Sequence, residues 1–271
     1  MRLGYDFNRM GFILSSNDND KTVDFGFKNV PTTEKEKLVN EVFNDVAENY
    51  DLMNDLLSFG LHRIWKSRAV NYMNLSQGDI VLDVASGTGD MAELIKRKIG
   101  TKGTVFISDI NTKMLNLGRD KLLDKGVNTV AINCDSEHLP FNSSSFDRVS
   151  IAFGLRNMTN KEVALKEINR VLKPNGKLVV LEFSQIHKSL SPIYDWYSFK
   201  ILPRLGKSIA GTKLAYEYLA ESIRKYPSPD EISNLMLRSG FLTARFQIMS
   251  FGVVSIHQAF AGKSIIGGKN E

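Results

Sequence analysis

Apolar and polar positions along the chain fall into blocks, and each block indicates one kind of secondary structure. Short apolar runs bounded by turn residues predict strands, whereas apolar residues that recur every three or four positions predict helices. The two kinds of block alternate between residues 77 and 187. We expect strands near 79–84, 104–109, 128–133, 147–153 and 177–183, and helices near 90–98, 112–125 and 161–172.

This alternation predicts a mostly parallel sheet with helices on both faces. The Lys-Pro-Asn-Gly run at 173–176 ends the third of these helices and turns the chain back into a strand. Pro229 begins a further helix near 230–239, and apolar runs at 241–248 and 253–260 complete a seven-stranded sheet. The fold class is therefore α/β and Rossmann-like, with ligands expected at the carboxyl ends of the strands.

The segments on either side of this core follow other patterns. Apolar residues at helical spacing between 34 and 73 predict an N-terminal helical lid, and residues 188–226 are too many for a simple connection and indicate a helical insert. We interpret the first 23 residues as a disordered leader, with an organelle-targeting segment as the alternative. The expected domains are 1–23 (leader), 24–76 (lid), 77–187 (cofactor-binding core), 188–226 (insert), 227–262 (end of the core) and 263–271 (tail).

Composition narrows the class of protein without defining its chemistry. With 42% hydrophobic residues among 271, the chain can bury a full core. Its one cysteine, Cys134, excludes an internal disulfide and suits a reducing compartment. No apolar run approaches the roughly 20 residues that a membrane-spanning helix needs. The formal net charge of +5 fits either a mildly basic soluble protein or one that contacts an anionic membrane surface.

Residues 81–90, Val-Leu-Asp-Val-Ala-Ser-Gly-Thr-Gly-Asp, are the most informative stretch. A predicted strand ends there in a turn of small residues, which leads directly into a helix. Gly87 and Gly89 allow a sharp turn and close approach of the backbone to a ligand. Asp109 follows Gly89 by 20 residues at the end of the next strand, a spacing that suits a carboxylate binding a ribose. The sequence thus predicts a site for an adenosine-type cofactor.

The glycine turn alone also satisfies the G-x-G-x-x-A pattern of nicotinamide and flavin enzymes. Three carboxylates favour S-adenosylmethionine instead. Asp83 precedes the turn, where it would attract a cationic methionine group and repel a pyrophosphate. Asp90 stands where a dinucleotide enzyme would place its phosphates, and Asp135 ends the third strand, where it can accept a hydrogen bond from an adenine amino group. In the alternative interpretation, Asp83 and Asp90 are helix-capping or solvated acids.

Several longer stretches are shared with one group of enzymes. They include Asp-Phe-Gly-Phe at 24–27, Tyr-Asp-Leu-Met-Asn-Asp at 50–55, Phe-Gly-Leu-Arg-Asn at 153–157 and Glu-Ser-Ile-Arg at 221–224. From 24 to 261 the chain resembles the ubiquinone/menaquinone biosynthesis C-methyltransferases, within the class I S-adenosylmethionine-dependent methyltransferases. The glycine turn occurs in many methyltransferases, whereas the last three of these stretches are specific to this family.

The resemblance implies cofactor contacts at Thr88, at Asp109, at the pair Asp135 and Ser136, and at Ala152. This chain departs from the family pattern at some of these positions. Many members have serine at the position of Ala152, Asn-Ala in place of the aspartate-serine pair, and glycine in place of Ser86. The change at Ala152 removes a hydroxyl and leaves the backbone as the contact, while Asp135 keeps an acceptor for the adenine amino group.

The reaction implied by the resemblance is methyl transfer to a ring carbon of a polyprenyl benzoquinol or a demethylmenaquinol. The carbon is a weak nucleophile until a neighbouring hydroxyl loses its proton, so a permanent cation near that oxygen would stabilise the phenolate-like transition state. Arg156 is the candidate for this cation, and Asn157 for a hydrogen bond to a quinol oxygen. Tyr50 and His62 are candidate proton-relay groups. Alternatively, Arg156 pairs with a lid carboxylate, Tyr50 only packs, and Glu182 either faces the substrate or pairs with Arg156.

Polyprenyl quinols reside in lipid, so the resemblance also implies peripheral contact with a membrane surface. The aromatic and basic residues of the insert, Tyr194, Trp196, Tyr197 and Phe199 among them, suit a bilayer interface. The alternative is that these aromatics belong to the core and the charges to a solvated face. We expect a cytoplasmic protein on a bacterial inner membrane or, alternatively, one on the matrix side of the mitochondrial inner membrane. The family also implies a homodimer or a quinone-biosynthesis complex as partner.

Other functions fit less of the sequence. A methyltransferase for another small aromatic or lipid substrate would not need the family-specific stretches. A nicotinamide-dependent oxidoreductase is disfavoured by the acidic surroundings of the turn, and a catalytically silent subunit of a quinone-synthesis complex is suggested only by Ala152 and Ser86. The chain has no Asn/Asp-Pro-Pro-aromatic motif for a target base, so we expect no nucleic-acid partner, and we expect no metal ion.

Overall fold

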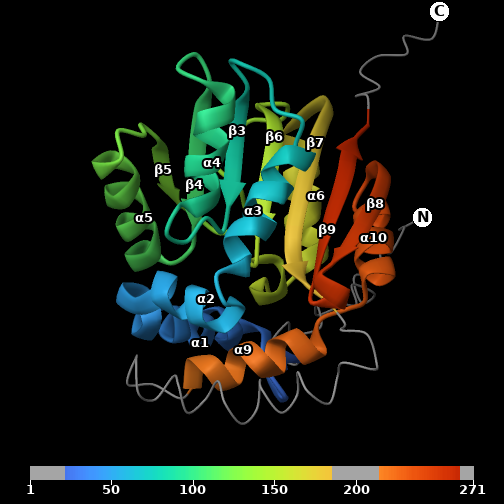
Figure 1. The fold of residues 1–271 in the computed structure, drawn as a ribbon. Coiled ribbons are helices and arrows are strands. Elements are labelled where there is room, and N and C mark those ends of the chain that lie inside the picture. The colour runs from blue at the N-terminus through green and yellow to red at the C-terminus, as the bar shows by residue number, and fades with distance from the viewer. Residues whose placement is uncertain (1–21, 185–213, 263–271) are drawn as a thin grey trace, which may run out of the picture.

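A central seven-stranded sheet organises the computed structural model, which describes residues 22–184 and 214–262 (Figure 1). The strand order is β5-β4-β3-β6-β7-β9-β8, with the first five strands parallel and β9 antiparallel to both of its neighbours. The strands are β3 (Ile80–Val84), β4 (Thr104–Asp109), β5 (Val130–Asn133), β6 (Phe146–Ala152), β7 (Leu172–Phe183), β8 (Phe241–Met249) and β9 (Val254–Ala261). The predicted α/β class with a mostly parallel sheet is confirmed.

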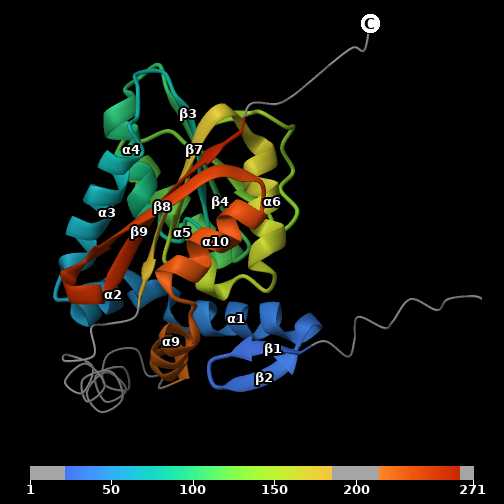
Figure 2. The same cartoon turned by 90° about the vertical axis from the view of Figure 1, so that its right-hand side faces the viewer.

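Helices cover both faces of the sheet, as the alternating pattern predicts (Figures 1 and 2). One face packs against α3, α4 and α5, and the other against α6 and α10. The central strands are buried on both faces and therefore read as continuous apolar runs in the sequence. The helices are α3 (Leu61–Tyr72), α4 (Asp90–Ile99), α5 (Thr112–Asp124), α6 (Lys161–Val171) and α10 (Pro229–Arg238).

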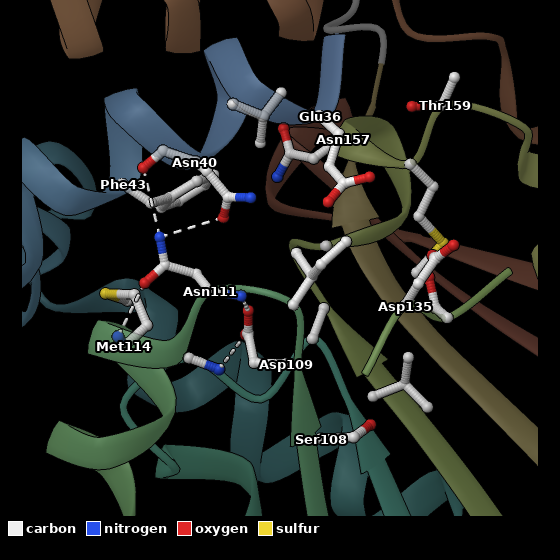
Figure 3. A pocket seen from close by; sticks show the side chains of 18 of the residues that line it. Glu36, Asn40, Phe43, Ser108, Asp109, Asn111, Met114, Asp135, Asn157 and Thr159 are labelled. Atoms are coloured by element: carbon white, nitrogen blue, oxygen red, sulfur yellow. Dashed lines mark hydrogen bonds between the residues drawn. The ribbon is translucent and has the colours of Figure 1, made fainter. Parts of the chain in front are cut away.

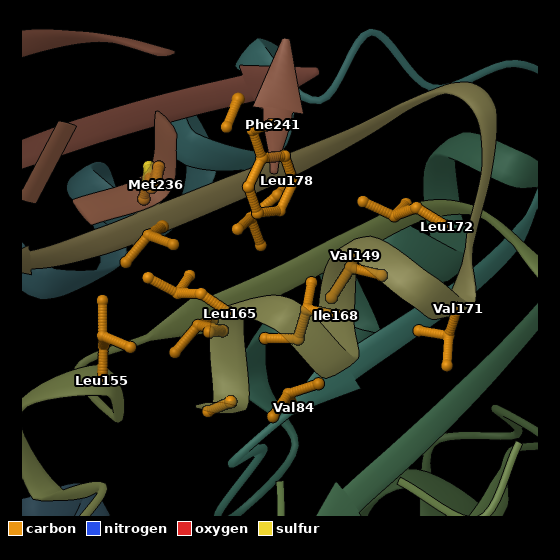
Figure 4. Close-up of a cluster of buried hydrophobic side chains, with 14 of the residues drawn as sticks. Val84, Val149, Leu155, Leu165, Ile168, Val171, Leu172, Leu178, Met236 and Phe241 are labelled. Carbon is orange, nitrogen blue, oxygen red and sulfur yellow. The ribbon is translucent and has the colours of Figure 1, made fainter. Parts of the chain in front are cut away.

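In the core beneath α6, one stripe of the helix packs against the side chains that alternate along the strands (Figure 4). Leu165 and Ile168 of α6 lie on one stripe of the helix, and successive strand residues point to opposite faces of the sheet. Val149 and Leu178 therefore face α6, and all four of these side chains are fully buried. Met236 of α10 closes the same cluster. This rigid layer fixes where the strand ends lie.

The Lys-Pro-Asn-Gly run differs from its expected role as a turn before a strand. β7 begins at Leu172, immediately after α6, and the run lies inside this strand. Phe146 pairs with Leu172, whereas the next pair joins Arg148 to Lys177, so the run bulges out of the ladder. Proline has no N–H to donate to a ladder, and Asn175 adopts a φ of 63°, so the run cannot continue as regular strand.

A second layer lies across the carboxyl ends of the parallel strands (Figure 2). It contains the hairpin β1 (Thr22–Phe25) and β2 (Lys28–Pro31), helix α1 (Thr32–Val46), the short helix η2 (Ala47–Asn49) and α2 (Tyr50–Ser58). Helix α9 (Leu214–Lys225), from far along the chain, packs with them in a separate apolar cluster. The helices expected between 34 and 73 are present, but α3 packs on the sheet rather than in this layer.

The remaining expectations concern the insert and the membrane. Of residues 188–226, only 214–226 are described, so the aromatic cluster at 194–199 lies outside the described residues. The expected leader, apart from its last two residues, and the whole of the expected tail also fall outside them. Among the described helices, none combines the length and the apolar character that a membrane crossing requires.

Candidate active site

Helix α1 and the carboxyl ends of β3, β4, β5 and β6 enclose a cavity of ≈ 270 Å³ (Figure 3). This is the position at which parallel α/β sheets bind their ligands. The structure brings seven of the residues predicted from the sequence into its lining: Tyr50, Gly87, Asp109, Asp135, Ser136, Ala152 and Asn157.

Asp109 connects the glycine turn to the end of β4. Its Oδ2 accepts a hydrogen bond from the backbone N–H of Gly87 at 2.9 Å, and its Oδ1 accepts one from the N–H of Asn111 at 2.9 Å. Burial raises the pKa of Asp109 above its ordinary value. The two backbone bonds fix the carboxylate at the strand end and leave further lone pairs for ligand hydroxyls. The predicted ribose-binding geometry is therefore available here.

Gly87 of the glycine turn occupies a position from which a side chain would enter the cavity. Gly87 has a φ of 53°, and a Cβ built on it would point toward the side chains of Met114 and Tyr50. Gly89 instead faces α5, because a Cβ there would overlap Leu122. The Thr88 hydroxyl donates a hydrogen bond to Asp51 of α2 at 2.7 Å. The structure thus does not bring Thr88 or Gly89 into the main cavity.

Asp83 lies in a smaller hollow that adjoins the cavity beside Gly87 and Ala152. It is fully buried, and the Ser150 hydroxyl donates a hydrogen bond to its Oδ1 at 2.6 Å. Among the described residues, its Oδ2 has no hydrogen-bond partner. Burial raises the pKa of Asp83 to about 7. A buried, unpartnered carboxylate oxygen is costly unless a ligand donor meets it, which fits the amino group of a methionine moiety.

Asp90 has a structural role instead of a place in the cavity. Its carboxylate forms ion pairs with Lys66 of α3 and Lys121 of α5, each at 2.7 Å. Burial opposes its charge, but the two lysines outweigh that effect and lower the pKa of Asp90. Asp90 is therefore an ion-paired acid rather than the helix-capping or solvated acid of the alternative, and it lines the smaller hollow together with Asp83.

The sequence interpretation missed the polar residues that α1 and the start of α5 contribute to the cavity. Asn111 caps α5 by accepting a hydrogen bond from the N–H of Met114. Its Nδ2 donates to Asn40 Oδ1 at 3.2 Å, a contact visible in Figure 3, and to Asn44 Oδ1 at 2.9 Å, so that Asn111 joins the core to α1. Glu36 and Asn40 of α1 face the same cavity. An asparagine two residues after Asp109, at a helix start, was the available signal for Asn111.

A second, mostly apolar pocket lies beside the cavity, between α1, α2, α3 and α9. The two spaces share three lining residues, Phe43, Tyr50 and Phe153. The few polar groups of the second pocket include Arg156, His62 and Tyr218. A polar space at the strand ends thus meets an apolar one beneath the lid, as transfer between a cofactor and an apolar acceptor would require.

Arg156 is a buried cation at the wall of the apolar pocket. Its Nη1 pairs with Glu182 Oε1 of β7 at 2.9 Å, and the guanidinium lies 5.3 Å from the centre of the Phe183 ring. Burial opposes its charge, yet Glu182 raises the pKa of Arg156, so the guanidinium stays charged. The suggestion that Arg156 pairs with a lid carboxylate is wrong, because the carboxylate is on β7. Among the described residues, its Nε has no partner.

Asn157 lies next to this cation and is oriented by the lid. The Tyr218 hydroxyl of α9 donates a hydrogen bond to Asn157 Oδ1 at 3.0 Å. Burial raises the pKa of Tyr218 to about 12, so the hydroxyl keeps its proton. The sequence interpretation did not include Tyr218 among the site residues. The amide Nδ2 of Asn157 donates to the Phe153 carbonyl at 3.5 Å and keeps a second N–H for another group.

His62 and Tyr50 occupy different positions relative to the two spaces. His62 lines the apolar pocket, and its Nε2 contacts Asp55 Oδ1 at 2.8 Å. Burial lowers the pKa of His62, so its ring is neutral near pH 7. Tyr50 lines both spaces. Of the two, only Tyr50 lies where the spaces meet, and a proton-relay role for either residue stays a prediction.

The arrangement of the sheet is shared with solved structures. The chain resembles a SAM-dependent methyltransferase from Aquifex aeolicus with a TM-score of 0.58 and 17% identity, over 78% of this chain and 97% of that one. This is the fold of the class I methyltransferases, and the cavity beside Asp109 lies at its strand ends. S-adenosylmethionine is the cofactor of this class, as the sequence predicts.

Sequence comparison narrows the class further. The profile of the ubiE/COQ5 methyltransferase family matches residues 31–261. The chain is 51% identical over 241 residues to the ubiquinone/menaquinone biosynthesis C-methyltransferase UbiE of Laribacter hongkongensis, covering 89% of this chain and 99% of that one. It is 51% identical over 239 residues to the UbiE of Chromobacterium violaceum, covering 88% and 98%. The chain belongs to the ubiE/COQ5 methyltransferase family, which confirms the predicted resemblance.

Proposed function

We propose that this protein transfers a methyl group from S-adenosylmethionine to a ring carbon of a polyprenyl benzoquinol, and of a demethylmenaquinol as a second substrate. The names of its close relatives support the substrate class. The observation that carries the proposal is the buried cation Arg156, which lies beside Asn157 where the apolar pocket meets the polar cavity.

In this proposal the polar cavity holds the cofactor. Asp109 accepts hydrogen bonds from the ribose hydroxyls, and Asp135 accepts one from the adenine amino group. The free Oδ2 of Asp83 receives the methionine amino group, while Gly87, Ser136 and Ala152 provide close backbone contact. S-adenosylmethionine supplies a methyl group that its sulfonium already activates. The chain therefore has mainly to align the acceptor carbon and to exclude water.

The quinol ring occupies the apolar pocket beneath the lid. Arg156 lowers the pKa of the quinol hydroxyl and stabilises the negative charge that develops on its oxygen. The Nδ2 of Asn157 donates a hydrogen bond to a quinol oxygen, because Tyr218 already occupies its Oδ1. Tyr50 and the neutral His62 line the pocket and carry the hydroxyl proton away from the ring.

We also propose that the protein acts at a membrane surface, because its substrate resides there. Phe59 and Phe251 are 79% and 80% exposed, and each is one or two residues away from a residue that lines the apolar pocket. Exposed aromatic rings fit the interfacial region of a bilayer. We propose the cytoplasmic face of a bacterial inner membrane as its location. Assembly as a homodimer or in a quinone-biosynthesis complex would be compatible with this location.

The experiment that tests the proposed function follows the transferred methyl group. Purified protein is incubated with isotope-labelled S-adenosylmethionine and a short-tailed demethyl benzoquinol, and the product is analysed by nuclear magnetic resonance. We expect the label in a methyl group on a ring carbon, and no product from Asp109→Ala, which should lose the cofactor. Label on oxygen, or no transfer by protein that binds S-adenosylmethionine, would contradict the proposal.

A further inference from the structure

A fourth hollow, which shares Arg156 and Tyr218 with the apolar pocket, has no part in the proposed reaction. It has a volume of ≈ 40 Å³, more than the roughly 10–15 Å³ that one water molecule needs. Residues of β1, α1, α6 and α9 and the residues after α9 contribute to its lining, so the hollow lies where the lid meets the core. Its inner lining is basic and includes Lys35, Lys161 and Arg156.

Neither lysine forms an ion pair with a carboxylate of the described residues. The Nζ atoms of Lys35 and Lys161 both donate to the backbone oxygen of Met158, at 3.2 and 3.3 Å. Within the described ranges, no carboxylate oxygen lies within 4.0 Å of either nitrogen. Lys35 is only 3% exposed, and burial together with the charge of Lys161 lowers its pKa to about 8. A buried and a half-buried ammonium group that share one carbonyl are unfavourable unless an anion joins them.

The hydroxyl groups around the hollow also favour a bound anion. Tyr226 lines it, is almost fully buried, and its hydroxyl has no hydrogen-bond partner among the described residues. Ser222 donates its proton to the Leu219 carbonyl. The nearby acids already have other partners. Glu182 pairs with Arg156, Asp24 pairs with Lys225 at the rim at 3.5 Å, and Glu137 accepts a hydrogen bond from the N–H of Asn160 at 2.7 Å. The interior therefore combines two positive charges with a free O–H donor.

We propose that this hollow binds a small phosphate-type oxyanion, either free phosphate or the phosphate of a phospholipid headgroup, between Lys35, Lys161 and Tyr226. Ammonium groups and a hydroxyl are the donors that such an anion needs. The bound anion would contact α1 of the lid and α6 of the core together, and so hold the lid closed. This inference is independent of the proposed function, since none of these three residues contacts the reacting groups in that proposal.

The test measures anion binding directly. Calorimetric titration with inorganic phosphate at constant ionic strength is compared between the wild type, Lys35→Met, Tyr226→Phe and Lys98→Met, whose exposed lysine on α4 serves as the control. We expect affinity to fall at least tenfold in Lys35→Met and severalfold in Tyr226→Phe, and to stay unchanged in Lys98→Met. Tyr226→Phe removes one hydroxyl only, so it keeps the test informative if Lys35→Met does not fold.

A second titration separates the two sources of the anion. Short-chain phosphatidic acid, kept below its micelle concentration, replaces inorganic phosphate. Binding of both ligands that depends on Lys35 assigns the site to the phosphate group itself, whereas binding of the lipid alone assigns it to a headgroup. If neither ligand binds, or if both bind Lys35→Met and Tyr226→Phe as tightly as the wild type, the proposal is wrong.

Discussion

At the scale of single residues, Asp83 shows most clearly how burial sets the chemistry of the site. Its pKa of about 7 lies well above the value near 4 expected in an unfolded chain. The folded protein therefore binds this proton more tightly than the unfolded chain does. Its contribution to stability is complete at low pH and is lost as the pH rises toward 7. The ionised form that a cationic ligand needs is thus available only at a cost in stability.

This linkage makes a testable prediction. Between about pH 4.5 and about pH 7.5, the free energy of unfolding of the wild type should fall relative to that of Asp83→Asn, which cannot ionise. Urea midpoints of both proteins, measured at steps of pH, give the difference. In contrast, Asp124→Asn, which alters an exposed carboxylate at the end of α5, should differ from the wild type by a constant amount. A pH-independent difference for Asp83→Asn would contradict this account.

At the scale of elements, charged contacts hold α2 of the lid against the core. Asp51 accepts a hydrogen bond from Thr88 at 2.7 Å and pairs with Lys121 of α5 at 2.5 Å. Thr88 lies in the glycine turn, so this carboxylate connects the lid to both the turn and α5. The pair is partly exposed, which limits its contribution to about 0.5–1 kcal/mol.

We therefore predict a modest and specific effect of Asp51→Asn. Affinity for S-adenosylmethionine should fall about two- to fivefold, because the lid closes less firmly over the cavity, while kcat at saturating cofactor stays close to that of the wild type. Calorimetric titration measures the first quantity and a saturation assay the second. Glu162→Gln removes an exposed ion pair within α6, away from the lid, and should change neither. Equal affinity in Asp51→Asn and Glu162→Gln would show that α2 does not control access.

At the scale of the whole molecule, much of the fold could be predicted because its signals are local. Buried parallel strands appear as continuous apolar runs, and the spacing from Gly89 to Asp109 reflects one strand–turn–helix–strand unit. The β1–β2 hairpin gave no such signal, because its strands have four residues each and are mostly not buried. Its stability comes from packing against α1 and α9, which lie far apart in the sequence.

In the candidate site, too, local signals could be predicted from the sequence and contacts between distant residues could not. Asp109 and Asp135 could be placed because strand ends share one edge of the sheet. The ion pair of Arg156 with Glu182 and the hydrogen bond from Tyr218 to Asn157 span 26 and 61 residues, so no periodicity in the sequence reports them. Thr88 also satisfies the motif, yet only the position of α2 determines that its hydroxyl faces Asp51. Composition and spacing identify the strand ends, and packing decides which side chains reach the ligand.

The central claim is that Arg156 activates an apolar quinol beside the cofactor. Its most direct test is the rate of methyl transfer to a short-tailed demethyl benzoquinol, at saturating S-adenosylmethionine, for the wild type and Arg156→Gln. The double variant Arg156→Gln/Glu182→Gln is measured alongside, because it leaves no buried carboxylate unpaired. The account predicts that kcat falls about 100-fold or more in both variants while affinity for the cofactor is retained. A kcat equal to that of the wild type, in variants that still bind the cofactor, would contradict it.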